Sequence, residues 1–184
     1  MVDETRNKIL EDILAAIQSG GGVLPADNAR AGFLNYDDSN SASISVTADT
    51  PTTITNNELG AKTIKTYAPS GVSDVWNATS NRIDFSDLSL GDMLDLRVDL
   101  QVTTSSPNTN LKINLLLGSG ASAYTLPFYD FAFKTAGSHD IHAYNGFYLG
   151  DSDTLNNSGE LQILSDEDCS VTVNGFYFKV IIRG

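Results

Sequence analysis

A run of nine residues near the middle of the chain, Leu94–Val102, alternates strictly between apolar and polar side chains. Successive side chains of a β-strand point to opposite faces, so the apolar positions share one face and the polar positions share the other. One dry face and one wet face indicate an antiparallel sheet lying on a core, because strands of parallel sheets are buried on both faces and read as continuous apolar runs. We therefore take this run as the central strand of the fold.

Shorter segments repeat the pattern, and residues typical of turns separate them about every ten residues. We expect strands or strand fragments at Ser43–Thr47, Thr52–Thr55, Lys62–Tyr67, Val75–Trp76, Ile83–Phe85, Leu111–Leu117, Tyr124–Phe133, Ile141–Leu149, Glu160–Leu164 and Val171–Arg183. Eight to ten short strands of this kind predict a mainly β protein, a two-sheet antiparallel β-sandwich of jelly-roll or immunoglobulin-like class.

Two of these segments carry further local signals. Pro127 interrupts Tyr124–Phe133, which is typical of an edge strand or a bend. At Asn174–Gly175 the apolar positions of the last segment shift from odd to even numbers. The shift indicates either a tight type I′ hairpin or a β-bulge, and we favour the hairpin.

The N-terminal segment Asp3–Gln18 has the 3.6-residue periodicity of a short amphipathic helix. Ser19–Gly22 ends it and forms a flexible tether. A helix this short is not stable alone, so its apolar stripe must be buried against its own sheet, another protein or further copies of itself. The glycine tether favours the last two. The proposed anchor residues of this stripe are Ile9, Leu10, Ile13, Leu14 and Ile17.

The domain organisation follows from this reading. Residues 1–24 form the helix and glycine tether, and residues 25–184 form the β-sandwich domain. Within the second unit, Val23–Asn40 is expected to begin as linker and loop, with Phe33 and Tyr36 attaching it to the body.

Composition narrows the range of partners. The chain has 184 residues and a net charge of -12, which disfavours nucleic acid and anionic lipid as partners. No apolar run is long enough for membrane insertion, and the first residues lack the apolar core of a signal peptide, so we expect synthesis in a cytoplasm. The single cysteine, Cys169, excludes an intrachain disulfide and is expected to act as a small buried hydrophobe.

Residues that could carry chemistry do not form a recognisable constellation. His139 and His142 would face opposite sides of a strand, so one metal ion could not easily bind both. Asp151 and Asp153 begin like a calcium loop, but Leu155 occupies a position where the EF-hand pattern requires an oxygen ligand. We therefore predict a protein that is not an enzyme, with no cofactor and no metal.

Three aromatic residues were considered as a platform for stacking a sugar: Trp76, Tyr144 and Tyr148. A lone tryptophan in a β-sandwich is more often part of the core, so we favour a core position for Trp76.

The segments Asp74–Phe85, Leu90–Arg97 and Val173–Arg183 resemble a family of bacteriophage structural proteins with a C-terminal jelly-roll domain like that of tumour necrosis factor. The resemblance extends over roughly the last two-thirds of the chain and contains no catalytic residues. It implies a homotrimer packed around a threefold axis. Family members of this kind decorate capsids as head fibres or cement proteins, or sit at the tips of tail fibres.

The first expectation for function is thus a trimeric capsid-decoration or head-fibre protein located in the virion. Its partners would be other copies of itself and the major capsid protein or another virion protein, contacted through the anchor residues. The alternative is a tail-fibre head domain that binds a host receptor or a host-surface glycan.

Overall fold

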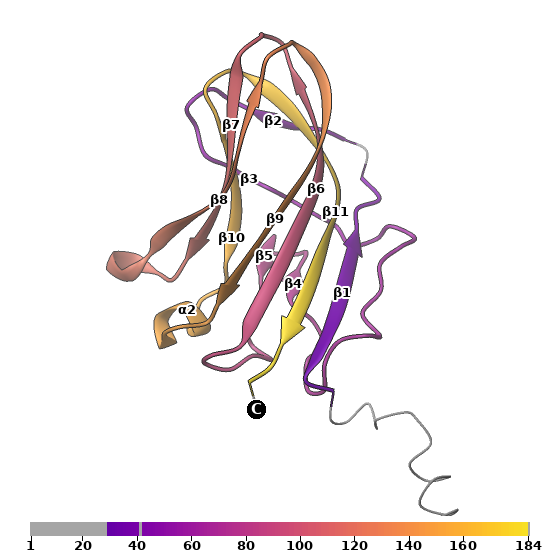
Figure 1. The fold of residues 1–184 in the computed structure, drawn as a ribbon, viewed down its shortest axis with the longest axis vertical. Helices are drawn as coiled ribbons and strands as arrows, with labels where there is room; N and C mark the ends of the chain where they lie inside the picture. Colours follow the sequence, from indigo (N-terminus) through magenta and orange to yellow (C-terminus); the bar gives the residue numbers. More distant parts are fainter. Residues whose placement is uncertain (1–28, 41, 184) are drawn as a thin grey trace, which may run out of the picture.

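Two antiparallel sheets face each other across an apolar core in the computed structural model, which describes residues 29–40 and 42–183 (Figure 1). Together they form the mainly β, jelly-roll sandwich expected from the alternation pattern. The first sheet has the strand order β1 (Ala31–Asp37), β11 (Cys169–Ile181), β6 (Met93–Thr104) and β9 (Gly137–Tyr148), and β2 (Ile44–Val46) pairs with β11 as its fifth strand. The second sheet has the order β3 (Thr52–Thr53), β10 (Glu160–Ser165), β7 (Thr109–Leu117) and β8 (Tyr124–Phe133).

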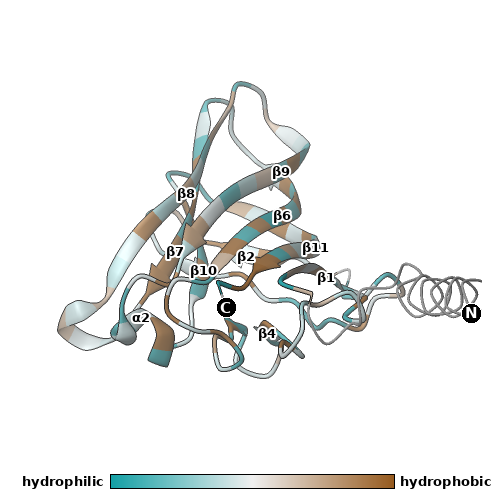
Figure 2. Ribbon diagram, turned by 60° about the horizontal axis from the view of Figure 1, so that its bottom comes forward, coloured by the Kyte–Doolittle hydropathy of each residue, from teal (hydrophilic) through white to brown (hydrophobic). Residues whose placement is uncertain are grey.

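The central strand β6 lies inside the five-stranded sheet, paired with β11 on one side and β9 on the other. Its five apolar residues from Leu94 to Val102 are fully buried, whereas Arg97 and Gln101 are exposed. The prediction for this strand is confirmed. Figure 2 shows the same alternation of hydropathy along β6 and β9.

Residues 31–37 form β1, so the prediction of linker and loop for this part of the chain is wrong. All seven residues pair with β11, which lies far along the sequence, and local sequence gives no sign of such a partner. Tyr36 is fully buried. Gly32 looks like a loop residue but is needed for packing, because a Cβ atom there would lie 2.2 Å from the carbonyl oxygen of Tyr67.

The apolar phase shift at Asn174–Gly175 is a β-bulge, so the favoured hairpin prediction is wrong. β11 continues through both residues, and its register with β6 shifts between Val173 and Gly175. The extra residue brings Val171 and Val173 before the bulge, and Phe176 and Phe178 after it, onto the same buried face.

The loop 60–69 lies along the free side of β1. The amide of Phe33 donates to the carbonyl of Tyr67, and Asn35 and Ile64 exchange two backbone hydrogen bonds, each of these three bonds being 2.8 Å long. A strand was predicted at Lys62–Tyr67, but the structure has only the isolated bridge between Asn35 and Ile64 there.

The remaining elements are short. β4 (Trp76–Asn77) and β5 (Arg82–Ile83) form a small hairpin, and the 3₁₀ turn η2 (Gly120–Ser122) precedes β8. The helix α2 (Ser152–Asn156) is capped by the Asp151 side chain, which accepts a hydrogen bond from the Thr154 amide. β8 is the last strand of its sheet and its register shifts near Pro127, which confirms the predicted edge strand.

The predicted N-terminal helix and its anchor residues lie outside the described residues, as does the boundary between residues 24 and 25. In the part of the chain that is described, none of the helices has the length and apolar character needed to cross a membrane.

Candidate functional site

The outward face of the five-stranded sheet carries a line of large side chains that runs across five segments of the chain. We call this set the aromatic row. It consists of Tyr67 in the loop beside β1, Phe33 on β1, Tyr177 on β11, Arg97 on β6 and Tyr144 on β9.

Stacking connects the members of the aromatic row. The ring centroids of Tyr67 and Phe33 are 5.0 Å apart, and those of Phe33 and Tyr177 are 5.6 Å apart, with nearly parallel planes in both pairs. The Arg97 guanidinium lies 5.4 Å from the centre of the Tyr177 ring. Tyr144 is the cross-strand partner of Arg97. Cross-strand contacts of this kind hold large side chains in a fixed arrangement on a sheet surface.

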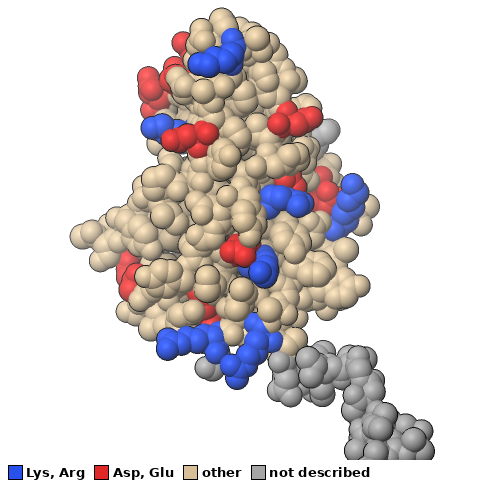
Figure 3. Space-filling model, viewed as in Figure 1, with Lys and Arg blue, Asp and Glu red and all other residues tan. Residues whose placement is uncertain are grey.

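The charges beside the aromatic row are paired with one another. Lys179 lies 3.6 Å from Asp95, and Arg97 lies 3.1 Å from Asp99. A hydrogen bond to Asp95 raises the pKa of the Tyr144 hydroxyl, which keeps it protonated as a donor. In Figure 3 acidic and basic side chains are scattered over a surface that is mostly uncharged.

The three predicted stacking residues lie in different environments. Trp76 is 2 % exposed, and its indole Nε1–H donates to the carbonyl of Asn56. It contacts Phe176 edge to face at 4.8 Å, so the expected core position is confirmed and Trp76 cannot stack on a ligand at the surface. Tyr144 and Tyr148 are 55 % and 64 % exposed, but only Tyr144 belongs to the aromatic row.

Sequence reasoning missed Phe33, Tyr67 and Tyr177 as surface residues. The signal for Tyr177 was present, since the phase shift at Gly175 turns odd-numbered positions outward. The sequence contains no such signal for Phe33 and Tyr67, because the positions of both residues depend on the long-range pairing of β1 with β11.

A polar network fixes the loops next to Tyr36. The Tyr36 hydroxyl donates to Asp74 at 2.6 Å and accepts from the Val75 amide at 2.9 Å, while Lys65 bridges Asp74 and Glu58. Burial and the Asp74 carboxylate raise the pKa of Tyr36 far above its ordinary range. Burial acts to raise the pKa of Asp74, but hydrogen bonds from Lys65 and Tyr36 outweigh it and lower this pKa. The network is structural, since each of its groups binds another part of the fold.

The histidines also make local contacts. His142 Nδ1 lies 2.7 Å from Asp99, and His139 stacks on Phe133 with ring centroids 4.6 Å apart. Within residues 29–40 and 42–183, no group of three or more potential ligand side chains is arranged to hold a metal ion. Cys169 is a free, half-buried thiol whose pKa is raised by burial.

The acidic loop residues hold backbone groups. Asp153 accepts from the Ser119 amide at 2.9 Å, and Asp166 accepts from the Asn110 amide at 2.7 Å. These contacts give both acidic residues a structural role in their loops.

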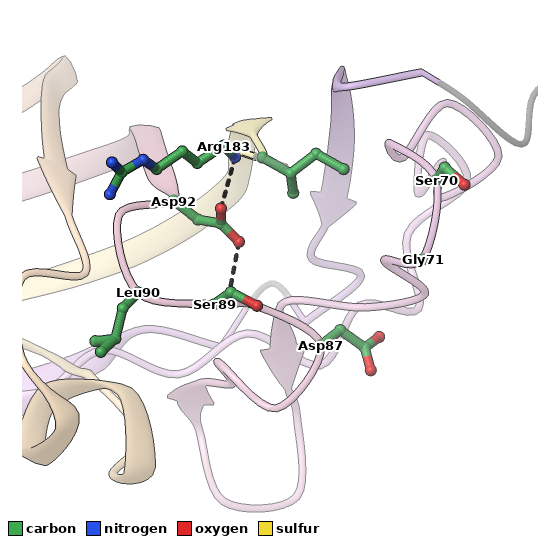
Figure 4. A pocket seen from close by; sticks show the side chains of 8 residues that line it. Ser70, Gly71, Asp87, Ser89, Leu90, Asp92 and Arg183 are labelled. Atoms are coloured by element: carbon green, nitrogen blue, oxygen red, sulfur yellow. Dashed lines mark hydrogen bonds between the residues drawn. The ribbon is translucent and has the colours of Figure 1, made fainter.

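A hollow of about 510 Å³ lies next to the end of the last strand, between Ser70, Leu90 and Arg183 (Figure 4). Its buried carboxylate, Asp92, accepts hydrogen bonds from the backbone amides of Ser89 and Arg183. Both carboxylate oxygens therefore serve to hold the chain end against the turn that precedes β6.

The fold and this surface define a class: an antiparallel jelly-roll sandwich with a row of stacked, partly exposed aromatic side chains on the outward face of one sheet. No protein-family model matches the chain, and no curated protein matches it either.

Several solved structures align with this chain at low sequence identity. The Eiger tumour necrosis factor of S. frugiperda aligns with a TM-score of 0.47 and 10% identity, over 84% of this chain and 93% of that one. A protein of infectious bursal disease virus, Gx strain, aligns with a TM-score of 0.45 and 17% identity, over 86% of this chain but 33% of that one. The vertex protein of PRD1 aligns with a TM-score of 0.39 and 15% identity, over 84% and 73% of the two chains.

Proposed function

We propose that this chain is a non-enzymatic structural protein of a virion, a homotrimer that decorates the capsid or forms a head fibre and is attached through its N-terminal segment. The observation that carries the proposal is the aromatic row. Tyrosine, phenylalanine and arginine are the residue types that concentrate in the cores of protein interfaces.

The charges on this face favour contact between identical copies. At a net charge of -12, two copies repel each other unless they meet where the local charge is balanced. The pairs Lys179–Asp95 and Arg97–Asp99 provide that balance next to Tyr177. A second copy of this chain is thus the occupant that we assign to the aromatic row.

A trimer agrees with the sequence resemblance of Asp74–Phe85, Leu90–Arg97 and Val173–Arg183 to phage jelly-roll proteins. A threefold ring is built from heterologous contacts, in which one patch meets a different patch of the next subunit. In our proposal the aromatic row is one of these two patches.

Attachment is assigned to the anchor residues of the N-terminal segment. The apolar stripe predicted from the sequence would need a partner, and the predicted glycine tether at Ser19–Gly22 would let it reach one. Three tethered stripes on one trimer would raise the effective concentration of each at a docking surface.

The test uses purified particles of the virus that encodes the chain. We expect mass spectrometry to find the chain in those particles, and the full-length protein to cosediment with particles from which it has been stripped. The double variant Ile13→Asp, Leu14→Asp should stay a folded trimer by light scattering and lose cosedimentation. The matched variant Lys8→Ala should keep it. A full-length protein absent from virions, or monomeric in solution, would overturn the proposal.

One observation favours the alternative of a tail-fibre head that binds a host-surface carbohydrate. Tyr148 is exposed and borders a cleft between the two sheets.

A further inference from the structure

A cleft of about 420 Å³ opens between the start of β8 and the end of β9, where the edges of the two sheets meet. Its volume falls within the range of small-molecule sites, about 300–1,000 Å³. Leu117, Leu126 and Phe147 line its apolar part. The aromatic row lies outside this lining, so the cleft is a separate feature of the surface.

Two tyrosines border the cleft, one from each sheet. Tyr124 on β8 is 43 % exposed and Tyr148 on β9 is 64 % exposed. Each presents an apolar ring and a hydroxyl, a combination suited to a ligand that is apolar on its faces and polar around its rim.

Both rings are positioned by neighbouring groups before any ligand arrives. The Tyr124 hydroxyl lies 3.3 Å from Thr154 Oγ1, and Thr154 is fixed in turn by the carboxylate of Asp151. Tyr148 packs against Gly150, where a Cβ atom would lie 2.8 Å from Cε2 of the ring. Rings held in this way lose little conformational freedom on binding.

Hydrogen-bonding groups surround the rings. β8 and β9 are each the last strand of a sheet, so one side of each backbone is not paired within its sheet. Gly146 and Gly150 line the cleft with backbone atoms alone, and the Gly146 amide donates to Asn145 Oδ1 at 2.8 Å, which places this polar pair near the cleft. A pyranose matches this set, since its C–H faces stack on tyrosine rings and its hydroxyls bond to backbone and phenol groups.

The charge of the site selects among sugars. The Asp151 carboxylate lines the cleft, and hydrogen bonds from Thr154 lower its pKa and keep it ionised. With a net charge of -12 on the whole chain, an anionic sugar would be repelled. We propose that the cleft between Tyr124 and Tyr148 is a binding site for a neutral saccharide. This inference goes beyond the virion role and does not depend on it.

The experiment titrates full-length protein, in whatever oligomeric state it adopts, with neutral sugars: glucose, galactose, mannose, rhamnose and N-acetylglucosamine. Binding is followed by chemical shifts of the backbone amides and by isothermal titration calorimetry. We expect at least one sugar to shift the amides of Gly146 and Gly150. Tyr148→Ala should weaken its binding about tenfold or more, equivalent to about 1.4 kcal/mol. Tyr148→Phe, which keeps the ring, should weaken it less.

A matched control lies on β8. Tyr129→Ala removes a tyrosine outside the cleft that is 43 % exposed, like Tyr124. This variant should bind within twofold of the unmodified protein. Gly150→Ala tests the site independently, because the added methyl displaces the Tyr148 ring and should also weaken binding.

Two results would overturn the inference: no neutral sugar shifts the amides of Gly146 or Gly150, or Tyr129→Ala weakens binding as much as Tyr148→Ala. If the chain is present in virions but binds no sugar, the sugar-binding inference is wrong and the virion role stands. If the chain binds sugar at the cleft but is absent from virions, only the virion role is wrong.

Discussion

The outward faces of the two sheets differ in chemistry although their inward faces follow the same alternation. The five-stranded sheet presents the aromatic row. The four-stranded sheet presents mostly polar residues: Asn110, Lys112, Asn114 and Leu116 on β7, and Glu160, Gln162 and Leu164 on β10. β7 and β10 pair without outward aromatic side chains, so strand pairing in this fold does not require them. The difference marks the five-stranded face as the one built for contact.

The largest expected effect comes from removing the centre of the aromatic row. Tyr177 contacts both Phe33 and Arg97, so Tyr177→Ala removes two contacts at once. A hot-spot residue contributes about 2 kcal/mol to an interface. We expect the dissociation constant for self-association to rise about 30-fold, measured by sedimentation equilibrium.

The matched variant for this experiment is Leu116→Ala, which shortens a half-buried outward side chain on β7. It should leave self-association unchanged. If Leu116→Ala dissociates the protein and Tyr177→Ala does not, the contact face is the four-stranded sheet and the comparison is reversed.

A smaller effect is expected on the stability of the dissociated protein. Arg97→Ala removes the contact with the Tyr177 ring and the pair with Asp99, whereas Lys112→Ala removes an exposed cation from the other sheet. Arg97→Ala should lower the free energy of unfolding by about 0.5–1 kcal/mol in urea titrations. Lys112→Ala should change it by less than about 0.5 kcal/mol. Equal losses in the two variants would show that the row adds nothing to the monomer.

The smallest effect concerns acid. Asp74 joins loops beside the five-stranded sheet, and Glu160, at the start of β10 in the other sheet, accepts from Thr53 and from Arg82, each at 2.6 Å. Burial acts to raise the pKa of Glu160, but these hydrogen bonds lower it, and the pKa of Asp74 is lowered in the same way. A carboxylate whose pKa is lower in the folded protein than in the unfolded chain stabilises the fold. This stabilisation is fully present above the ordinary pKa values, 4.5 for Glu160 and 3.8 for Asp74. It is lost as the pH falls through the lower pKa values of the folded protein.

Unfolding experiments from pH 6 down to pH 2 test this expectation. Glu160→Gln should flatten the pH dependence of the free energy of unfolding beginning at the higher pH, because the ordinary pKa of Glu160 is the higher of the two. Asp74→Asn should flatten it only in the lower part of this pH range. Each contribution should be at most about 1 kcal/mol, since the Asp74 side chain is 39 % exposed and solvent screens it. A pH dependence unchanged in both variants would contradict the assigned ion pairs.

Sequence alone predicted the parts of the fold that alternation determines. Leu94–Val102 and Leu111–Leu117 are strands because burial on one face imposes period two, and β6 and β7 contain both segments. Prediction from the sequence failed where the local structure depends on pairing with a strand far along the chain. Asn174–Gly175 has the local chemistry of a hairpin turn, but pairing with β6 on both sides makes it a bulge.

The candidate sites were predictable only in part. Tyr144 and Tyr148 could be found as exposed aromatics, since outward positions of a strand are readable from its pattern. The sequence could not show that Tyr144 belongs to the aromatic row and Tyr148 to the cleft. Tyr148 acquires its partner Tyr124 because the end of β9 lies beside the start of β8, which belongs to the other sheet. Tyr144 faces Arg97 through strand pairing that no local signal encodes.

The loop along β1 has a consequence for aggregation. Growth of a continuous β-ribbon requires each subunit to offer two unpaired strand edges, one to accept the previous molecule and one to template the next. In the five-stranded sheet, the hydrogen bonds of Phe33 and Asn35 to loop 60–69 occupy the outer edge of β1, so β9 and the short strand β2 are the edges that remain. A molecule that adds a strand to β9 of its neighbour therefore finds the β1 edge of that sheet closed to further growth.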